Sequence, residues 1–352
     1  MRAVFGGGDA ARAWLLGSLA VVAVLAITDI TLSGDVNISG AFAVAPFVAG
    51  TAASARQTLT IGLLTTLVAG VLTIYDDSAA GPATARMIAV LLASGLAPYA
   101  ASRREERERR LSDMTRVAEV AQLAILAPVP PTVGPLALAS VYLSASREAH
   151  VGGDLYEVVD TPWGVRTIVG DVRGKGLDAV RLAAVVLASF REKAAAVESL
   201  PDVARLMDAL LRPQLGPEDF VTAVLGCFSA AGGLDLVNCG HPPPVIWGAT
   251  SGALISTSTP TAPLGLDPEP VAERFELTSA DRVLFYTDGL VEARAPGGGF
   301  VPLDALLVHI GDDPLNLALN NVLAELRRLA RDGIQDDLAM LMVEFQGAAP
   351  PA

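Results

Sequence analysis

The sequence contains little cysteine, which narrows the kinds of site it can build. Its 352 residues include two cysteines, Cys227 and Cys239, and both lie in apolar runs typical of strands. It has no Cys-x-x-Cys pair and only three histidines, which lie far apart in the chain. Isolated cysteines in apolar runs are more often buried thiols than disulfide partners or metal ligands. We therefore expect two buried, reduced thiols and no zinc site.

Acidic side chains are scarce in the first hundred residues and plentiful afterwards. Only Asp9, Asp29, Asp35, Asp76 and Asp77 are acidic there, out of 38 Asp and Glu in the whole chain. The formal net charge is −13 and the pI is near 4.7. A nucleic acid backbone requires a basic face. The charge therefore excludes nucleic acid as the partner.

The same hundred residues are strongly apolar. The whole chain has a mean hydropathy of +0.47 and is 52% hydrophobic, which is high for a soluble protein. Four apolar segments share this region, at residues 13–32, 41–55, 58–75 and 86–101. A membrane span needs about 20 mostly apolar residues, so the second and fourth could instead be re-entrant or shielded. A soluble helical sensor domain is the alternative, but few residues here could cover a solvated face.

Flanking charges predict the orientation of these segments. Arg2 and Arg12 precede the first segment, Arg56 lies between the second and third, and five arginines follow the fourth within residues 103–110. Positive residues favour the cytoplasmic side. We expect a multi-pass protein of the cell membrane with an even number of spans and both termini in the cytoplasm. Arg86 is the one charge against this.

A charged helix is expected after the membrane region. Its arginines and glutamates have helical spacing, and apolar residues from Leu111 to Leu123 form a stripe that could pair with a second copy of the chain, through residues 105–125, or with the C-terminal domain. Pro128, Pro130 and Pro131 should end the helix. We therefore predict a transmembrane region at residues 1–101, a cytoplasmic linker and regulatory helix at 102–131, and a catalytic domain at 132–347.

The C-terminal domain alternates runs of strands with pairs of helices. Strands are expected at residues 138–143, 155–160, 165–170, 221–228, 234–238, 244–246, 272–277, 282–286 and 338–345. Helices are expected at residues 177–195, 201–212, 303–310 and 315–331. This order indicates an α+β layered sandwich rather than a regular βαβ alternation.

Four aspartate-bearing segments lie next to these strands. They are Gly152-Gly153-Asp154, Gly170-Asp171, Thr287-Asp288-Gly289 and Gln335-Asp336-Asp337. Carboxylates brought together from several strand ends can hold two hard divalent cations, Mg²⁺ or Mn²⁺. Two such ions can clamp a phosphoryl group and activate the water that attacks it. The pattern predicts metal-dependent hydrolysis of a phosphate ester.

Six motifs in this order carry a family resemblance. They are Val151-Gly152-Gly153-Asp154-Leu155-Tyr156, Gly170-Asp171-Val172-Arg173-Gly174-Lys175-Gly176, Cys239-Gly240-His241-Pro242-Pro243-Pro244, Pro263-Leu264-Gly265-Leu266, Tyr286-Thr287-Asp288-Gly289-Leu290-Val291-Glu292-Ala293 and Asp336-Asp337-Leu338. Over residues 117–345 the chain resembles the SpoIIE-type branch of the PPM (PP2C-like) serine/threonine phosphatases, which includes RsbU-like phosphatases. The resemblance implies an αββα sandwich of two antiparallel sheets flanked by helix pairs, here preceded by an all-α transmembrane bundle.

The resemblance also implies roles for single residues. Asp171 would bridge both metals beside the Val172 carbonyl, and Asp154 would bind the second metal. Asp288 and Asp336 would bind the first metal, although a one-place shift to Asp337 is open. Water activated by the two Mn²⁺ or Mg²⁺ ions would attack the phosphorus in line, without a phosphoenzyme.

Other residues in and near the motifs have two alternative roles each. Arg173 and Arg147 are candidates for binding phosphate, although each could be a solvated surface arginine. His241 could donate a proton to the leaving oxygen or could be a turn residue that fixes its loop. His150 is a weaker candidate, and His309 should only pack. Glu157 and Ala339 depart from the family pattern, and Ala339 removes a hydroxyl that could hydrogen bond near the metals.

The implied substrate is a phosphoserine or phosphothreonine on a small protein, typically a STAS-domain anti-anti-sigma factor. Three other interpretations compete with this one. Gly152-Gly153-Asp154 is similar to a diguanylate cyclase signature but lacks its second acidic residue. A catalytically inert phosphatase-like scaffold would be favoured by loss of a carboxylate, and all four are present. A transporter or channel would need an intramembrane charged pathway, which is missing.

Overall fold

The computed structural model describes most of the chain in two compact units. The described residues are 6–31, 39–74, 80–144, 152–248, 254–256, 260–308, 310–311, 313–330, 334 and 336–347. One unit is Met1–Ser112 and the other is Asp113–Ala352. Their boundary falls inside the segment predicted as a linker.

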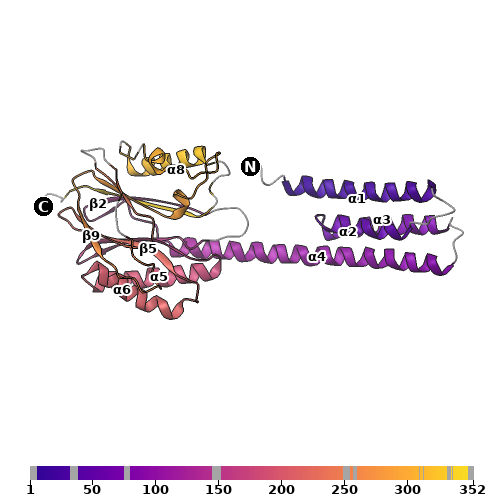
Figure 1. Ribbon diagram of the computed structural model, residues 1–352, viewed down its shortest axis with the longest axis horizontal. Helices are drawn as coiled ribbons and strands as arrows, with labels where there is room; N and C mark the ends of the chain where they lie inside the picture. Colours follow the sequence, from indigo (N-terminus) through magenta and orange to yellow (C-terminus); the bar gives the residue numbers. More distant parts are fainter. Residues whose placement is uncertain are drawn as a thin grey trace. The chain divides into compact units, whose positions relative to one another are not determined.

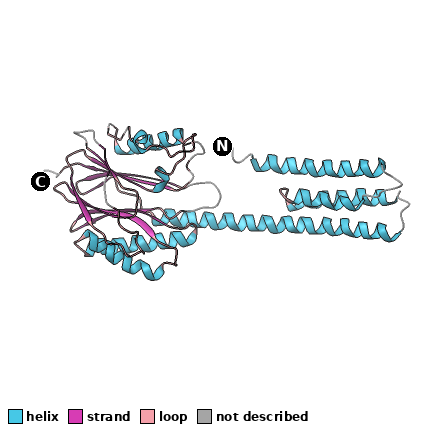
Figure 2. Cartoon of the chain, in the orientation of Figure 1, coloured by secondary structure: helices cyan, strands magenta, loops and turns pink. Residues whose placement is uncertain are grey.

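The first unit is helical (Figures 1 and 2). Its helices are α1 (Gly6–Thr31), the 3-10 turn η1 (Ser39–Ala43), α2 (Val44–Gly50), α3 (Ala55–Ile74) and the first part of α4 (Ala80–Ile125). Among the described residues, three helices are long and apolar enough to cross a membrane, within Arg12–Thr31, Ala55–Ile74 and Ala83–Ile125. Large apolar side chains such as Leu16, Leu63 and Leu67 are exposed on them. These three helices suggest membrane anchoring.

The second predicted segment, residues 41–55, forms no spanning helix. Its α-helix has seven residues, Val44–Gly50, which is far below the roughly 20 needed to cross as a helix. This segment still runs alongside α4: a Cβ built on Gly40 would lie 3.6 Å from Arg86, and one on Gly50 would lie 3.5 Å from the Ala97 carbonyl. The segment is therefore too short to span a membrane as a helix, and its re-entrant and shielded alternatives stay predictions. The side of the membrane on which each terminus lies stays a prediction.

Two adjacent residues of α4 bind the turn between α2 and α3. The Arg104 guanidinium donates to the Gly50 carbonyl at 2.6 Å and to the Ala53 carbonyl at 2.7 Å. The Glu105 carboxylate accepts from the Ala55 backbone N–H at 2.9 Å. Helix C-termini leave carbonyls unpaired and helix N-termini leave N–H groups unpaired. Each side chain therefore meets the helix end of opposite partial charge.

The second unit is built on two antiparallel sheets. The six-stranded sheet has the order β1-β2-β11-β10-β7-β8 and the five-stranded sheet has the order β3-β4-β5-β6-β9. The strands are β1 (Thr132–Val133), β2 (Leu136–Leu143), β3 (Leu155–Thr161), β4 (Gly164–Val172), β5 (Val221–Phe228), β6 (Gly233–Cys239), β7 (Val245–Trp247), β8 (Leu254–Ser256), β9 (Ala272–Glu276), β10 (Arg282–Tyr286) and β11 (Leu338–Phe345). The helices and helical turns are α5 (Leu177–Ala196), α6 (Leu200–Leu211), η2 (Arg212–Gln214), η3 (Asp288–Leu290), α7 (Leu303–Leu306) and α8 (Leu315–Leu329).

These elements form four layers, as Figure 1 shows. Helices α5 and α6 pack on strands of the five-stranded sheet, and α8 packs on β2 and β11 of the six-stranded sheet. The main core lies between the two sheets and beneath α5 and α6, and a second core lies beneath α8. Strands such as β10 are buried along their whole length because both faces are covered, which explains their continuous apolar sequence. The predicted αββα sandwich is confirmed.

One predicted helix is much shorter than expected. In place of residues 303–310, only Leu303–Leu306 is helical, and His309 lies outside the described residues. The chain then turns, and Gly311 approaches the Trp247 ring so closely that a Cβ there would lie 2.1 Å from it. This contact requires glycine at position 311. Ile310 is buried although the predicted helix does not extend to it.

The end of α4 belongs to the second unit. Ala118 is buried there and packs with Val180 of α5, and α4 ends at Ile125, just before the prolines. Met114, Val117, Val120 and Leu123 remain exposed. One face of this helix therefore pairs with the catalytic unit. Pairing of the exposed face with a second copy stays a prediction.

Candidate active site

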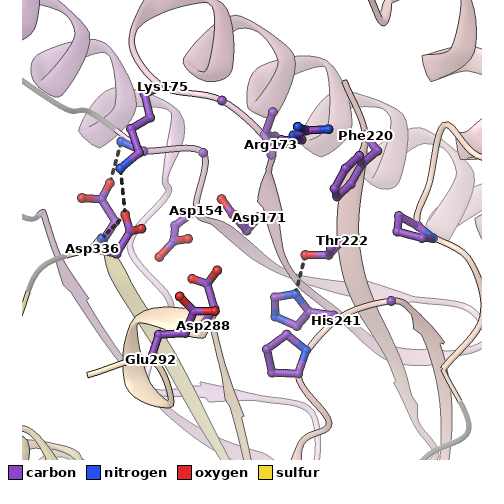
Figure 3. Close-up of a pocket in the computed structure, with 18 of the residues that line it drawn as sticks. Asp154, Asp171, Arg173, Lys175, Phe220, Thr222, His241, Asp288, Glu292 and Asp336 are labelled. Carbon is purple, nitrogen blue, oxygen red and sulfur yellow. Dashed lines mark hydrogen bonds and ion pairs between the residues drawn. The ribbon is translucent and has the colours of Figure 1, made fainter. Parts of the chain in front are cut away.

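A cleft of about 740 Å³ lies where the two sheets meet, and all four predicted aspartate segments contribute to it. Asp154 directly precedes β3, Asp171 is the penultimate residue of β4, Asp288 opens η3 after β10, and Asp336 lies two residues before β11. Of these four aspartates, which Figure 3 labels, two come from each sheet. Strand ends that are distant in sequence are brought together by the sandwich itself.

Three of the aspartates form a compact cluster. One carboxylate oxygen from each of Asp154, Asp171 and Asp288 lies within 4.8 Å of the other two. Asp154 is buried, whereas the other two are partly exposed to the cleft. Converging carboxylate oxygens are the ligands that Mg²⁺ and Mn²⁺ prefer. The residues present therefore fit a divalent cation.

The charges of the cluster repel one another. Burial, followed by repulsion from Asp288 and Asp336, raises the pKa of Asp171 from 3.8 to about 7. Burial, followed by Asp336 and Glu292, raises the pKa of Asp288 to about 6. Burial and then Asp171 raise the pKa of Asp154 well above its ordinary value. Ionising all the carboxylates of such a cluster costs free energy when no cation is present. A bound cation would offset this repulsion, so the cluster favours binding of a cation.

The raised pKa values predict how pH affects the metal-free protein. Between about pH 4 and 7 the folded state keeps protons on Asp171 that the unfolded state releases, so stability falls as pH rises through this range. In EDTA, the melting temperature of the metal-binding unit should be on the order of 5 °C lower at pH 7.5 than at pH 5. Thermal unfolding of the full chain in detergent would measure this. The transition of the metal-binding unit is identified beforehand as the one whose midpoint changes when Mn²⁺ is added. Asp171→Asn should flatten the dependence, and an equal or higher melting temperature at pH 7.5 would contradict it.

The two neighbouring aspartates 336 and 337 face different surroundings. The Asp337 carboxylate is buried and accepts from the Tyr142 hydroxyl at 2.8 Å and from the Gly152 N–H at 2.7 Å. The Asp336 carboxylate is about half exposed and lies 3.7 Å from the Lys175 ammonium. Asp337 therefore anchors the turn before Asp154, whereas Asp336 is directed to the cleft. This geometry favours Asp336 over Asp337 as a ligand.

A threonine that sequence reasoning missed supports Asp154. The Thr287 hydroxyl donates to Asp154 Oδ2 at 2.7 Å and accepts from the Ala339 backbone N–H at 2.9 Å. Thr287 thus holds the Asp154 carboxylate in orientation, and the backbone of Ala339 in turn holds Thr287. The position of Thr287 next to Asp288 in the sequence was the signal that could have identified it.

His241 lies in the cleft wall with both ring nitrogens engaged. Its Nε2 lies 3.1 Å from the Tyr286 carbonyl and its Nδ1 lies 2.9 Å from the Thr222 hydroxyl. A carbonyl only accepts, so Nε2 carries the proton and Nδ1 accepts from Thr222. Burial lowers the pKa of His241 to about 3, which makes the ring neutral. The arrangement favours the interpretation of a residue that fixes its loop.

Of the two arginines predicted to bind phosphate, the structure describes Arg173. Arg173 lines the cleft, but its guanidinium donates to the Glu218 carbonyl at 2.8 Å and lies over the Phe220 ring at 5.2 Å. Arg147 and His150 lie outside the described residues. Val172 and two residues that sequence reasoning did not single out, Lys175 and Glu292, also line the cleft.

The α4 helix reaches this site through one side chain. Gln122 is buried and its amide nitrogen lies 3.4 Å from the backbone carbonyl of Asp154, as a long hydrogen bond. The end of α4 is thus in direct contact with a residue of the acidic cluster.

Comparison with known proteins agrees with this geometry. The family model described as Stage II sporulation protein E (SpoIIE) matches residues 161–346, more than half of the chain. The RsbU and RsbW domains of Rv1364c from Mycobacterium tuberculosis are 25% identical over 62% of this chain with a TM-score of 0.51, and the chain spans 62% of that structure's length. The SiaA-PP2C domain of Pseudomonas aeruginosa is 18% identical, with a TM-score of 0.59 over 68% of this chain and 99% of its own, and shows the same fold. The chain therefore belongs to the SpoIIE family, and its C-terminal unit is a PP2C-type protein serine/threonine phosphatase domain.

Proposed function

We propose that this protein is a membrane-anchored, metal-dependent phosphatase that removes phosphate from serine or threonine of a partner protein at the cytoplasmic face. The observation that carries the proposal is the cluster of Asp154, Asp171 and Asp288, whose oxygens lie within 4.8 Å of one another in an open cleft. The apolar helices of the first unit support the anchoring.

The residues of the site divide into ligands and supports. We assign Asp154, Asp171, Asp288 and Asp336 to two Mn²⁺ or Mg²⁺ ions, with the Val172 carbonyl beside them. When bound, the ions supply positive charge for the phosphoryl oxygens and make the attacking water more acidic.

The support comes from residues behind the ligands. Thr287 orients Asp154, and Asp337 holds the Gly152 turn. Neutral His241 joins the loop that carries it to the end of β10. We therefore give His241 a positioning role and assign no proton transfer to it.

A phosphorylated STAS-domain regulator is the substrate that the family resemblance favours. One similar structure contains an RsbU domain, the type of phosphatase that the sequence resembles. The net charge of −13 argues against capture of an acidic substrate by a basic surface. We therefore expect docking by shape and specific contacts.

Metal removal tests the proposed activity. The full-length protein in detergent should hydrolyse p-nitrophenyl phosphate and phosphoserine peptides with Mn²⁺, and EDTA should abolish both activities. Restoring Mn²⁺ or Mg²⁺ in excess over EDTA should restore the rate, because the ligand set consists of hard oxygen donors. Phosphate release by malachite green would follow the peptides. A rate that EDTA leaves unchanged would contradict the metal-dependent mechanism, and no turnover with either metal would favour an inert scaffold instead.

A further inference from the structure

The cleft has an unbalanced set of charges. Its lining includes six carboxylates, and the cationic side chains among the described lining residues are Arg173 and Lys175. His241, the remaining titratable base there, is neutral. A phosphate monoester brings a further negative charge into this surface. A positively charged protein donor would stabilise its oxygens in addition to any metal.

Arg173 is poorly placed to be that donor. Its guanidinium is held by the Glu218 carbonyl, lies 3.8 Å from the Glu218 carboxylate and stacks on Phe220. Figure 3 shows it turned toward Phe220, on the opposite side of the cleft from Asp336. Arginine bound in this manner shapes the loop and the cleft wall, and the assignment of phosphate binding to it stays a prediction.

Lys175, unlike Arg173, lies on the same side of the cleft as Asp336 (Figure 3). It lies in the short loop between β4 and α5, between Gly174 and Gly176, whose φ values of +122° and +81° favour glycine. Its ammonium lies 3.7 Å from Asp336 Oδ1, and about half of the side chain is exposed. Its charge also opposes the rise in the pKa of the Asp288 carboxyl. The positively charged end therefore lies beside Asp336, one of the carboxylates that line the cleft.

The choice of lysine at this place is notable within this chain. Lys175 and Lys193 are the only lysines among 25 basic residues. Arginine has a rigid fork that suits fixed partners, whereas lysine has a compact charge on a flexible stem. A flexible ammonium can leave one oxygen partner for another. At Asp336, a divalent cation would neutralise the carboxylate and so weaken its hold on Lys175.

We propose that Lys175 binds the phosphoryl oxygens of the substrate, moving its ammonium from Asp336 to the phosphate. This inference rests on the proposed phosphatase function and adds a substrate-binding residue to it. Lys175 forms no covalent bond, and its ammonium keeps its proton throughout.

The first test compares phosphate affinity with metal affinity in the full-length protein. Lys175→Met should raise the inhibition constant of inorganic phosphate against p-nitrophenyl phosphate hydrolysis by about 10- to 100-fold. It should leave Mn²⁺ affinity equal or tighter, because a competing cation has been removed. Lys175→Arg should recover part of the phosphate affinity. Lys193→Met, on α5 outside the cleft, is the matched control and should match the wild type.

Three outcomes would overturn the proposal. Unchanged phosphate inhibition in Lys175→Met would remove Lys175 from substrate binding. A parallel loss of phosphate affinity and Mn²⁺ affinity, with a lower melting temperature, would show a structural role. The same measurements on Arg173→Met test the rival assignment, since a larger effect there would transfer the role to Arg173.

A second test observes the lysine directly. Reductive methylation with ¹³C-formaldehyde keeps the charge and gives signals from two lysines and the amino terminus. With Mg²⁺ present, inorganic phosphate should shift the Lys175 signal, assigned by its absence in Lys175→Arg, and leave the Lys193 signal in place. An unmoved Lys175 signal, in a protein that phosphate inhibits, would contradict the proposal. Failure of the phosphatase function would instead appear as a wild type without metal-dependent turnover.

Discussion

Asp171→Asn should lower Mn²⁺-dependent phosphate release by about 10³-fold or more. Asp171 has a carboxylate oxygen within 4.8 Å of those of Asp154 and Asp288, and its pKa is raised by burial and then by Asp288 and Asp336. Asparagine keeps the shape of the side chain but removes the charge that would hold a cation. The initial rate with p-nitrophenyl phosphate at increasing Mn²⁺ measures the loss and separates weak metal binding from slow turnover.

Stability provides an internal control for this variant. Removing one of several repelling carboxylates should raise the melting temperature in EDTA at pH 7.5 while activity is lost, so unfolding cannot explain the loss. Asp178→Asn, at an exposed position in the first turn of α5, is the matched substitution and should keep wild-type turnover. An active Asp171→Asn protein would mean that the acidic cluster is not the catalytic site.

Gly153→Ala should cost about 2–3 kcal/mol of unfolding free energy and at least about tenfold in activity. A Cβ on Gly153 would lie 2.3 Å from the Val172 carbonyl oxygen and 2.7 Å from the Val172 nitrogen. These are backbone atoms, which cannot rotate away. The Val172 N–H also donates to the Gly153 carbonyl at 3.2 Å. The methyl group would therefore force apart the two chain segments that carry Asp154 and Asp171.

Urea unfolding and phosphate release, measured on the same preparation, would check both effects. Gly297→Ala is the matched control, because Gly297 is exposed and a Cβ there meets nothing within 4 Å. It should change stability by no more than about 0.5 kcal/mol. A Gly153→Ala protein as stable and active as this control would show that the two segments can separate without consequence.

The central strands could be predicted from sequence because they are buried on both faces. The predicted bounds of β5, β10 and β11 agree with the structure, since each is a mostly apolar run that is followed by a polar residue. β1 and β8 were missed, because strands of two and three residues have no pattern of their own and exist through pairing with β2 and β7.

The carboxylates of the site were predictable, and their supports were not. Asp154, Asp171 and Asp288 stand beside glycines at strand ends, a local signal. The support from Tyr142 to Asp337 joins residues 195 positions apart, and nothing in either segment indicates the other. Lys175 had a local signal, two flanking glycines, but its proximity to Asp336 depends on how the two sheets meet.

The clamp formed by Arg104 and Glu105 limits how α4 can move. Sliding α4 by one residue along its axis would carry Arg104 away from the carbonyl end of α2 and would leave the first N–H of α3 unpaired. Both losses occur at the point where the apolar part of α4 meets its charged part. These contacts therefore fix the position of α4 along its axis relative to α2 and α3, which disfavours axial sliding of α4 alone. A membrane signal that uses this helix would have to tilt it, bend it or shift it together with α2 and α3.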